Sequence, residues 1–311
     1  KITENGKYVL TLIDSSFNED KIEFVINNTK PVITLPVLKE DLFTNNGNVN
    51  ITDDIEFEVE ISLNDEVKNK VNATLKEDGT YYVDLDLNSY GKGEYVITAT
   101  DKASNTIDSQ VFDFDATGQL VTTIDELNDA LTDSTIETIY LANDLENLTT
   151  RIIVNRAVII EGNGNKLSFT DAINSAPSGE KQGIVIVSND VVINDLEVEM
   201  NAIDGIWTGT YAIQVYKGTA TLNNVTTTKA DGGIFSNDSV VTLIGTIDVS
   251  GNEFGGIEVS NGASTLNATE ATFINTTEAF RKPTIWTDQT PDAVVNVEGF
   301  TSNNTIKNGQ V

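Results

Sequence analysis

GIVIV at residues 183–187 returns down the chain as AIQVY at 212–216, GIFSN at 233–237, GIEVS at 256–260 and TIWTD at 284–288. The isoleucines of these motifs recur at intervals of roughly 21 to 29 residues. Each motif is a short β-rich run in which alternate aliphatic residues share one face of a strand. A strand repeat of this period predicts a β-solenoid, in which each coil buries its apolar side only by stacking on the next.

A second aliphatic position follows nine residues after the leading isoleucine, at Ile193, Leu222, Leu243, Leu266 and Val294. Asparagine comes next at Asn194, Asn223 and Asn267, and at Asn296 after a drift of about one residue. Side-chain amides repeated at a tight bend can hydrogen-bond one another from coil to coil. The pattern resembles the asparagine ladder of right-handed parallel β-helices of the pectate-lyase type. Alternatively, asparagine is simply common in this chain.

A short helix is expected before the first coil. Thr123 and Glu126 have the spacing of a capping box, and Ile124, Leu127, Ala130 and Leu131 share one helical face. Such a helix would cover the open end of the solenoid. Residues 118–311 resemble the pectate-lyase-like domains of secreted and surface proteins of Gram-positive bacteria, which implies a right-handed parallel β-helix with a short N-terminal capping helix.

The first third of the chain contains a different repeat. NGKYVLTLIDSSFNEDKIEFVI, from Asn5, aligns with KGEYVITATDKASNTIDSQVFDF, from Lys92, at an offset of 87 residues. Each copy predicts two strands joined by a D-x-x-x-N turn, which is a β-hairpin. The pattern resembles bacterial Ig-like domains, so we expect an all-β chain: 1–30 as the terminal hairpin of a preceding Ig-like domain, 31–117 as an Ig-like β-sandwich, and 118–311 as the β-helix. The chain would then begin inside a domain.

Composition narrows the function. The chain has 48 acidic and 19 basic residues, a net charge of -29, no cysteine and no histidine. This charge repels nucleic acid, and no apolar run has the length of a membrane span, so neither nucleic-acid binding nor direct membrane insertion is expected. The composition resembles Gram-positive surface-layer and exported wall proteins, which implies an extracellular place, at the bacterial cell surface or secreted.

No catalytic residues are predicted. Without histidine and cysteine, the Ser-His-Asp and Cys-His mechanisms are excluded. Polysaccharide lyases resembling this fold carry an R-x-P-x-x-R pattern, of which Arg281 and Pro283 match the first half, but Trp286 stands where the second arginine belongs.

Structural calcium is the one cofactor considered. Asp113 and Asp115 alternate on the last strand before the solenoid, and we expect Asp101, with Asp53 and Asp54, to lie near them. Clustered carboxylates suit a hard cation. Alternatively, Asp101, Asp113 and Asp115 belong to the solvated face of an acidic protein.

A candidate binding edge follows from the uneven coil lengths, because the extra residues accumulate just before the leading isoleucines. Six side chains there are proposed as ligand contacts: Trp207, Tyr211, Phe254, Phe280, Arg281 and Trp286. Exposed aromatic rings can stack on sugars or anchor a protein. The alternative is that each ring packs its own loop against the wall of the solenoid.

Together these patterns predict a non-catalytic structural or adhesive component of a bacterial cell surface, a surface-layer or wall-associated protein with Ig-like spacers. Its expected partner is a cell-wall or host glycan or a neighbouring surface protein. The alternative is a secreted glycan-binding or polysaccharide-degrading β-helix.

Overall fold

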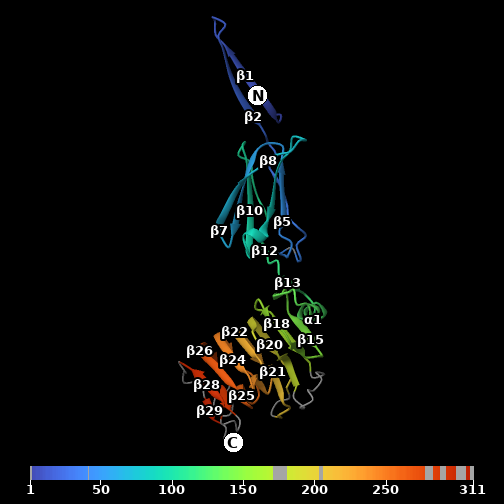
Figure 1. Ribbon diagram of the computed structural model, residues 1–311, viewed down its shortest axis with the longest axis vertical. Coiled ribbons are helices and arrows are strands. Elements are labelled where there is room, and N and C mark those ends of the chain that lie inside the picture. The colour runs from blue at the N-terminus through green and yellow to red at the C-terminus, as the bar shows by residue number, and fades with distance from the viewer. Residues whose placement is uncertain are drawn as a thin grey trace. The chain divides into compact units, whose positions relative to one another are not determined.

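The computed structural model describes residues 2–40, 42–170, 181–202, 206–276, 283–287 and 292–298, and the backbone alone of 306–308 (Figure 1). The chain divides into two compact units, Lys1–Ala116 and Thr117–Val311. The first is built mainly from antiparallel strands and the second from parallel strands.

The first unit begins with a two-stranded antiparallel hairpin, β1 (Gly6–Ile13) and β2 (Glu19–Ile26). Tyr8 lies opposite Phe24, and their rings stack with centroids 5.6 Å apart. The turn is fixed by the Asp14 carboxylate, which accepts hydrogen bonds from the backbone N–H groups of Ser16 and Asn18 at 2.8 and 2.9 Å. The D-x-x-x-N pattern therefore encodes this turn directly.

The rest of the first unit consists of two sheets. One contains β4 (Phe43–Thr44), β6 (Phe57–Leu63), β7 (Glu66–Asn72), β10 (Gly93–Asp101), β11 (Thr106–Asp108) and β12 (Phe112–Phe114). The other contains β3 (Val32–Thr34), β5 (Asn48–Asp53), β8 (Thr74–Leu75) and β9 (Tyr81–Asp86), and a 3-10 turn, η1 (Leu87–Ser89), follows β9.

Strand alternation creates the core of this unit. Ile97 in β10, Ile51 in β5 and Val83 in β9 belong to one cluster of buried side chains contributed by both sheets. Strands β3 to β12 thus form two sheets around a shared core, as a β-sandwich requires. The assignment of this sandwich to the Ig-like class stays a prediction.

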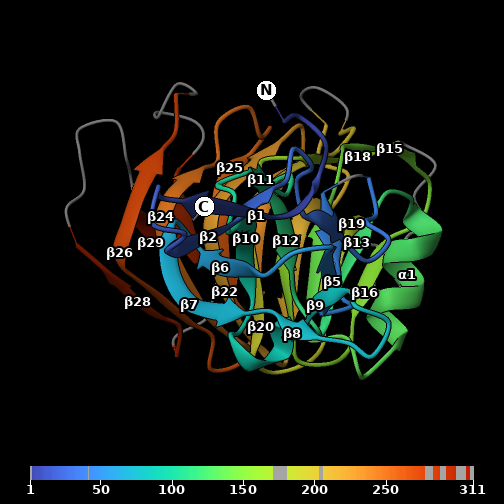
Figure 2. The same ribbon diagram turned by 90° about the horizontal axis from the view of Figure 1, so that it is seen from above.

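The second unit is a parallel solenoid (Figure 1, Figure 2). Its larger sheet contains β13 (Gly118–Val121), β14 (Thr138–Leu141), β15 (Leu145–Leu148), β17 (Val158–Glu161), β18 (Lys166–Phe169), β20 (Val191–Glu199), β22 (Thr219–Thr228), β24 (Val240–Asp248), β26 (Thr265–Ile274) and β28 (Val294–Val297). Its smaller sheet contains β16 (Ile152–Val154), β19 (Lys181–Ile186), β21 (Thr210–Tyr216), β23 (Gly232–Asn237), β25 (Gly255–Ser260), β27 (Ile285–Thr287) and β29 (Ile306–Asn308).

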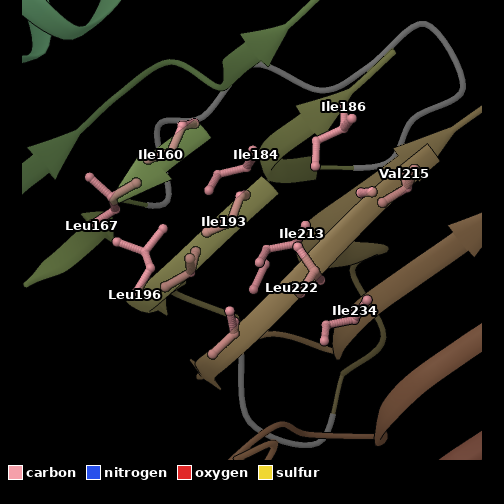
Figure 3. Packing of buried hydrophobic residues seen from close by; sticks show 14 of the residues in the cluster. Ile160, Leu167, Ile184, Ile186, Ile193, Leu196, Ile213, Val215, Leu222 and Ile234 are labelled. Carbon is pink, nitrogen blue, oxygen red and sulfur yellow. The ribbon is translucent and has the colours of Figure 1, made fainter. Parts of the chain in front are cut away.

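The predicted column of isoleucines is confirmed. In the smaller sheet, Ile184 pairs with Ile213, Ile213 with Ile234, and Ile234 with Ile257, and all four side chains are buried. Register extends the column to Ile152 at one end and Ile285 at the other. Figure 3 shows Ile184, Ile213 and Ile234 in successive strands, with Ile193 and Leu222 from the larger sheet beside them.

The asparagine ladder is only partly as predicted. The Nδ2 atom of Asn223 donates to Oδ1 of Asn194 at 3.3 Å, but the next strand places Ile244 opposite Asn223. Asn267 pairs with Thr242, which lies two residues before the ladder position at Ile244. The Oδ1 atom of Asn267 accepts a hydrogen bond from Nδ2 of Asn296 at 2.8 Å. The assumed nine-residue spacing was wrong here, because the turn between Ser260 and Thr265 is two residues longer than the one between Asn237 and Val240.

The larger sheet bends immediately after the ladder column. Asp195 and Asn224 adopt left-handed backbone conformations, with φ of 50° and 52°. Gly245, with φ of 66°, occupies the next bend, where an added Cβ would lie 2.2 Å from Oδ1 of Asn224. Asx and glycine residues adopt this conformation most readily, so the sequence permits a sharp corner in successive coils.

The predicted capping helix is α1 (Ile124–Thr132), which lies at one end of the solenoid (Figure 1, Figure 2). The Thr123 hydroxyl accepts the Glu126 N–H at 3.2 Å, and Leu127 and Leu131 are buried against the first coils. At the other end of the helix, Arg156 donates to the carbonyl oxygens of Ala130 and Leu131 at 2.8 and 2.9 Å. Both helix termini therefore have partners for their unpaired backbone groups.

Candidate functional site

The site is built on the outer face of the smaller sheet of the solenoid. Strand alternation turns the isoleucines inward, so the residues next to them point outward. Register aligns these outward residues in one column: Val185, Gln214, Phe235, Glu258 and Trp286. Although they point away from the core, the first four are buried, so other parts of the protein cover this face.

Four aromatic rings form a connected group on this face, which we call the aromatic patch: Trp207, Tyr211, Phe235 and Phe254. Tyr211 stacks on Phe235 with ring centroids 4.7 Å apart. Trp207 meets Tyr211 and Phe254 edge to face, at 6.0 and 5.3 Å. Such edge-to-face pairs are favourable beyond the area that they bury, which holds the indole in a defined orientation.

Trp207 is the most exposed member of the patch. Its side chain is 50% exposed, whereas Tyr211 is only 3% exposed and Phe235 is buried as well. The buried rings therefore act as a support, and Trp207 offers the accessible surface. A large half-exposed indole on a fixed support is suited to contact with another molecule.

Trp286 lies beside the patch over two glycines. A Cβ at Gly232 would lie 3.0 Å from Cη2 of Trp286, and a Cβ at Gly255 would lie 2.5 Å from its Cζ3. The same added Cβ atom at Gly232 would lie 2.7 Å from Cε1 of Tyr211. The two glycines thus leave room for both rings against the sheet, and Trp286 is partly buried there.

Glu258 is the carboxylate of this face that contacts the patch. The Tyr211 hydroxyl donates a hydrogen bond to its Oε2 atom, and Glu258 is buried. This bond joins β21 to β25 across the intervening β23. It ties the supporting tyrosine to the wall of the solenoid.

The structure separates the six predicted contact residues. Trp207 has the exposure expected of a contact residue, and Phe254 and Trp286 are partly exposed beside it. Tyr211 was wrongly predicted as a surface contact: it is buried because it points into the aromatic patch and hydrogen-bonds Glu258. Phe280 and Arg281 lie outside the described residues. Phe235 was not predicted, although its signal was an aromatic residue at an outward position of the strand motif.

The three carboxylates proposed for calcium do not come together. Glu94 pairs with Asp113 at one end of β10, whereas Asp101 is at its other end. Seven residues of extended strand separate these positions, on the order of 24 Å. Asp115 is buried and its carboxylate lies 3.5 Å from the ammonium of Lys92. Within the described ranges, no three acidic side chains gather closely enough to hold a metal ion.

Each of these aspartates has a structural setting of its own. The Asp101 carboxylate accepts hydrogen bonds from the backbone N–H and the side-chain amide of Asn105, at 2.8 and 2.7 Å. Partial desolvation, and secondarily the charge of Glu94, raises the pKa of Asp113, which lies at the surface. Asp101 therefore fixes a hairpin turn, as Asp14 does in the first hairpin.

Asp53 lies close enough to Asp54 and Asp101 for their charges to act on it. Asp53 is only 8% exposed, and its Oδ2 atom has no hydrogen-bond partner. Burial, together with the Asp54 side chain and the charges of Asp54 and Asp101, raises the pKa of Asp53 to about 6. The Asp54 carboxylate accepts a hydrogen bond from Nδ2 of Asn27 at 2.9 Å.

Two arginines of the early coils, Arg151 and Arg156, have structural partners. Arg151 donates to Oε1 of Gln182 at 3.1 Å, and Arg156 caps α1.

In the part of the chain that the structure describes, no helix combines the length and the apolar character needed to cross a membrane.

Comparisons with known proteins bear on the solenoid. Residues 118–232 match the model of a family described as a pectate lyase-like adhesive domain, which is less than half of the chain. No curated protein sequence matches the chain.

Two solved structures are similar to this chain in part. One, SRRP from L. reuteri 53608, is 14% identical, with a TM-score of 0.21, and the match covers 62% of this chain and 100% of that one. The other, pectate lyase Pel3 from Pectobacterium carotovorum, is 12% identical, also with a TM-score of 0.21, over 91% of this chain and 92% of that one. Likenesses this weak say nothing about function.

Proposed function

We propose that this protein is a non-catalytic, adhesive component of a bacterial cell surface, and that the aromatic patch of its solenoid binds the partner. The observation that carries the proposal is Trp207, half exposed and held in place by buried rings. The match of residues 118–232 to an adhesive domain family supports it. A parallel solenoid suits this role, because its stacked coils present outward side chains on a rigid wall.

The partner in this proposal is a cell-wall or host glycan, or a neighbouring surface protein. An indole face can stack on the apolar face of a sugar ring or fill a pocket in a protein. The net charge of -29 disfavours a polyanionic partner, because like charges repel. A neutral glycan or a protein therefore fits better than an acidic polysaccharide.

The proposal also covers the handedness of the solenoid, the role of the sandwich and the location of the protein. The solenoid is taken as right-handed, the sandwich as an Ig-like spacer, and the whole as an extracellular surface-layer or wall-associated protein of the Gram-positive type. Spacer domains that hold a binding module away from the cell wall would make its patch accessible to large partners.

The decisive experiment compares Trp207→Ala, in the loop before β21, with a matched control on that strand. Tyr216, at the far end of β21, is also exposed, at 40%, and lies outside the aromatic patch. Binding is measured on an array of neutral and acidic glycans and on intact bacterial cells. We expect Trp207→Ala to weaken binding about tenfold or more and Tyr216→Ala to leave it unchanged. Equal binding by both variants would contradict the proposal.

The polysaccharide-degrading alternative is tested separately. We expect no unsaturated sugar products from polygalacturonate or related acidic glycans, because Trp286 replaces the second arginine of the lyase pattern and the charge of the chain repels such substrates. An ultraviolet absorbance assay for unsaturated products, with a characterised lyase as the positive control, measures this directly. A rise in absorbance would establish enzymatic activity.

A further inference from the structure

One buried carboxylate lies at the base of the aromatic patch. Asp231 directly precedes β23 and is fully buried, with no exposed side-chain surface. Burying a charged group is costly unless hydrogen bonds compensate, so the partners of this carboxylate show what it does.

All the hydrogen bonds of the Asp231 carboxylate go to the segment that carries Trp207. Its Oδ2 atom accepts from the backbone N–H of Thr208 at 2.6 Å, from the Thr208 hydroxyl at 2.9 Å, and from the backbone N–H of Thr210 at 2.9 Å. Two of these three donors are backbone N–H groups, so this oxygen fixes the backbone on the C-terminal side of Trp207.

The backbone of the same residue holds the second loop of the patch. The carbonyl oxygen of Asp231 accepts from the N–H groups of Phe254 and Gly255, at 2.8 and 3.3 Å. The segments bearing Trp207 and Phe254 come from different coils, yet both are attached to this one residue. Their rings meet at 5.3 Å.

We infer that Asp231 is the positioning residue of the patch, which holds the Trp207 and Phe254 segments together and makes the exposed indole a fixed contact surface. Its importance for binding rests on the function proposed above. The positioning itself does not, and it can be measured without any ligand.

The two carboxylate oxygens of Asp231 differ in their hydrogen bonds. This difference makes Asp231→Asn a conservative substitution for the test. Oδ2 accepts all three hydrogen bonds, whereas Oδ1 is buried and has no partner. Asparagine can place its oxygen at the Oδ2 position and its amide nitrogen at the Oδ1 position. Asp231→Asn should therefore keep Trp207 in place, and Asp231→Ala should release it, because two backbone N–H groups lose their acceptor.

The experiment uses the full chain with Trp286→Phe, which leaves Trp207 as the only tryptophan. Near-ultraviolet circular dichroism and acrylamide quenching of fluorescence report whether the indole is fixed against its neighbours. We expect Asp231→Ala to lose the tryptophan signal and to increase quenching, while Asp231→Asn retains both properties. Asp238→Asn is the matched control, since Asp238 directly follows the same strand and is exposed, and it should change neither.

An unchanged tryptophan signal in Asp231→Ala would overturn the inference. If that variant fails to fold, Thr208→Val decides, because it removes only the hydroxyl donor: increased quenching supports the inference, and unchanged quenching overturns it. Binding is then measured for Asp231→Ala. A variant that loses the indole signal but binds normally would contradict the proposed function and leave the positioning role intact.

Discussion

In the first hairpin Leu10 is 48% exposed, whereas its counterpart in the repeated hairpin, Ile97, is completely buried. The two hairpins share their sequence pattern, and each D-x-x-x-N turn is held by its aspartate. What differs is the partner: β10 pairs with β6 and shares a core with the opposite sheet, whereas β1 pairs with β2 alone in the structure described. Local sequence therefore encodes the turn, and burial comes from strands far away in the chain.

The largest expected effect tests this difference in burial. Ile97→Ala should lower the free energy of unfolding of the sandwich by about 2–5 kcal/mol, because it leaves a cavity in the core. Leu10→Ala, at the equivalent position, should change it by less than about 0.5 kcal/mol, as expected of a surface substitution. Urea unfolding of both variants measures the contrast. Equal destabilisation would show that the first hairpin is packed against something else.

A smaller effect concerns pH and has no counterpart in the first hairpin: Asp53, at the end of β5, lies near Asp101 in the second hairpin. The folded pKa of Asp53, about 6, is above the ordinary value of 3.8, so the folded state keeps this proton where the unfolded state has lost it. Stability from this group is therefore complete below pH 4 and is lost as pH rises to about 6. After allowance for solvent screening, we expect a loss of about 1–2 kcal/mol.

Asp53→Asn isolates this contribution. The difference in melting temperature between wild type and variant should change between pH 4 and pH 6.5, with the variant gaining relative to wild type as the pH rises. Asp14→Asn, in the first hairpin, serves as the comparison at an exposed site. A difference between wild type and Asp53→Asn that stays constant across this range would contradict the assignment.

The smallest expected effect is a difference in stability between variants of the two turn asparagines, Asn18 and Asn105. Nδ2 of Asn105 donates both to Asp101 at 2.7 Å and to the backbone carbonyl of Asn27 at 3.0 Å, whereas Nδ2 of Asn18 bonds Asp14 at 2.8 Å. Asn105→Ala should therefore cost about 1 kcal/mol more than Asn18→Ala, the value of one additional hydrogen bond. Hydrogen exchange near Asn27 should increase only in Asn105→Ala. Equal losses of stability in the two variants, with no difference in hydrogen exchange near Asn27, would contradict the additional role of Asn105.

The solenoid was predictable from sequence because parallel stacking turns a repeated spacing into a column. Ile184, Ile213, Ile234 and Ile257 needed no information beyond their spacing and alternation. Asn267 was misplaced because a turn two residues longer shifts the register of its strand. Turn length is not visible in the pattern of apolar residues alone.

The site was harder to predict, for two physical reasons. Tyr211 was predicted as an exposed contact on a loop, but it lies in β21 and is buried among other aromatic rings. Asp101 and Asp113 are close in sequence, yet they mark opposite ends of an extended strand. Proximity in space and exposure in the final fold are both decided by tertiary packing.

The isoleucine column also makes the solenoid modular. If the coil between Ile213 and Ile234 were deleted as a unit, Ile184 would meet Ile234, and the new seam would again join isoleucine to isoleucine. Insertion of a coil would preserve the seam in the same way. The length of the solenoid can therefore evolve in steps of one strand spacing, about 4.8 Å, through gene duplication and loss, while each coil keeps the loop that it carries.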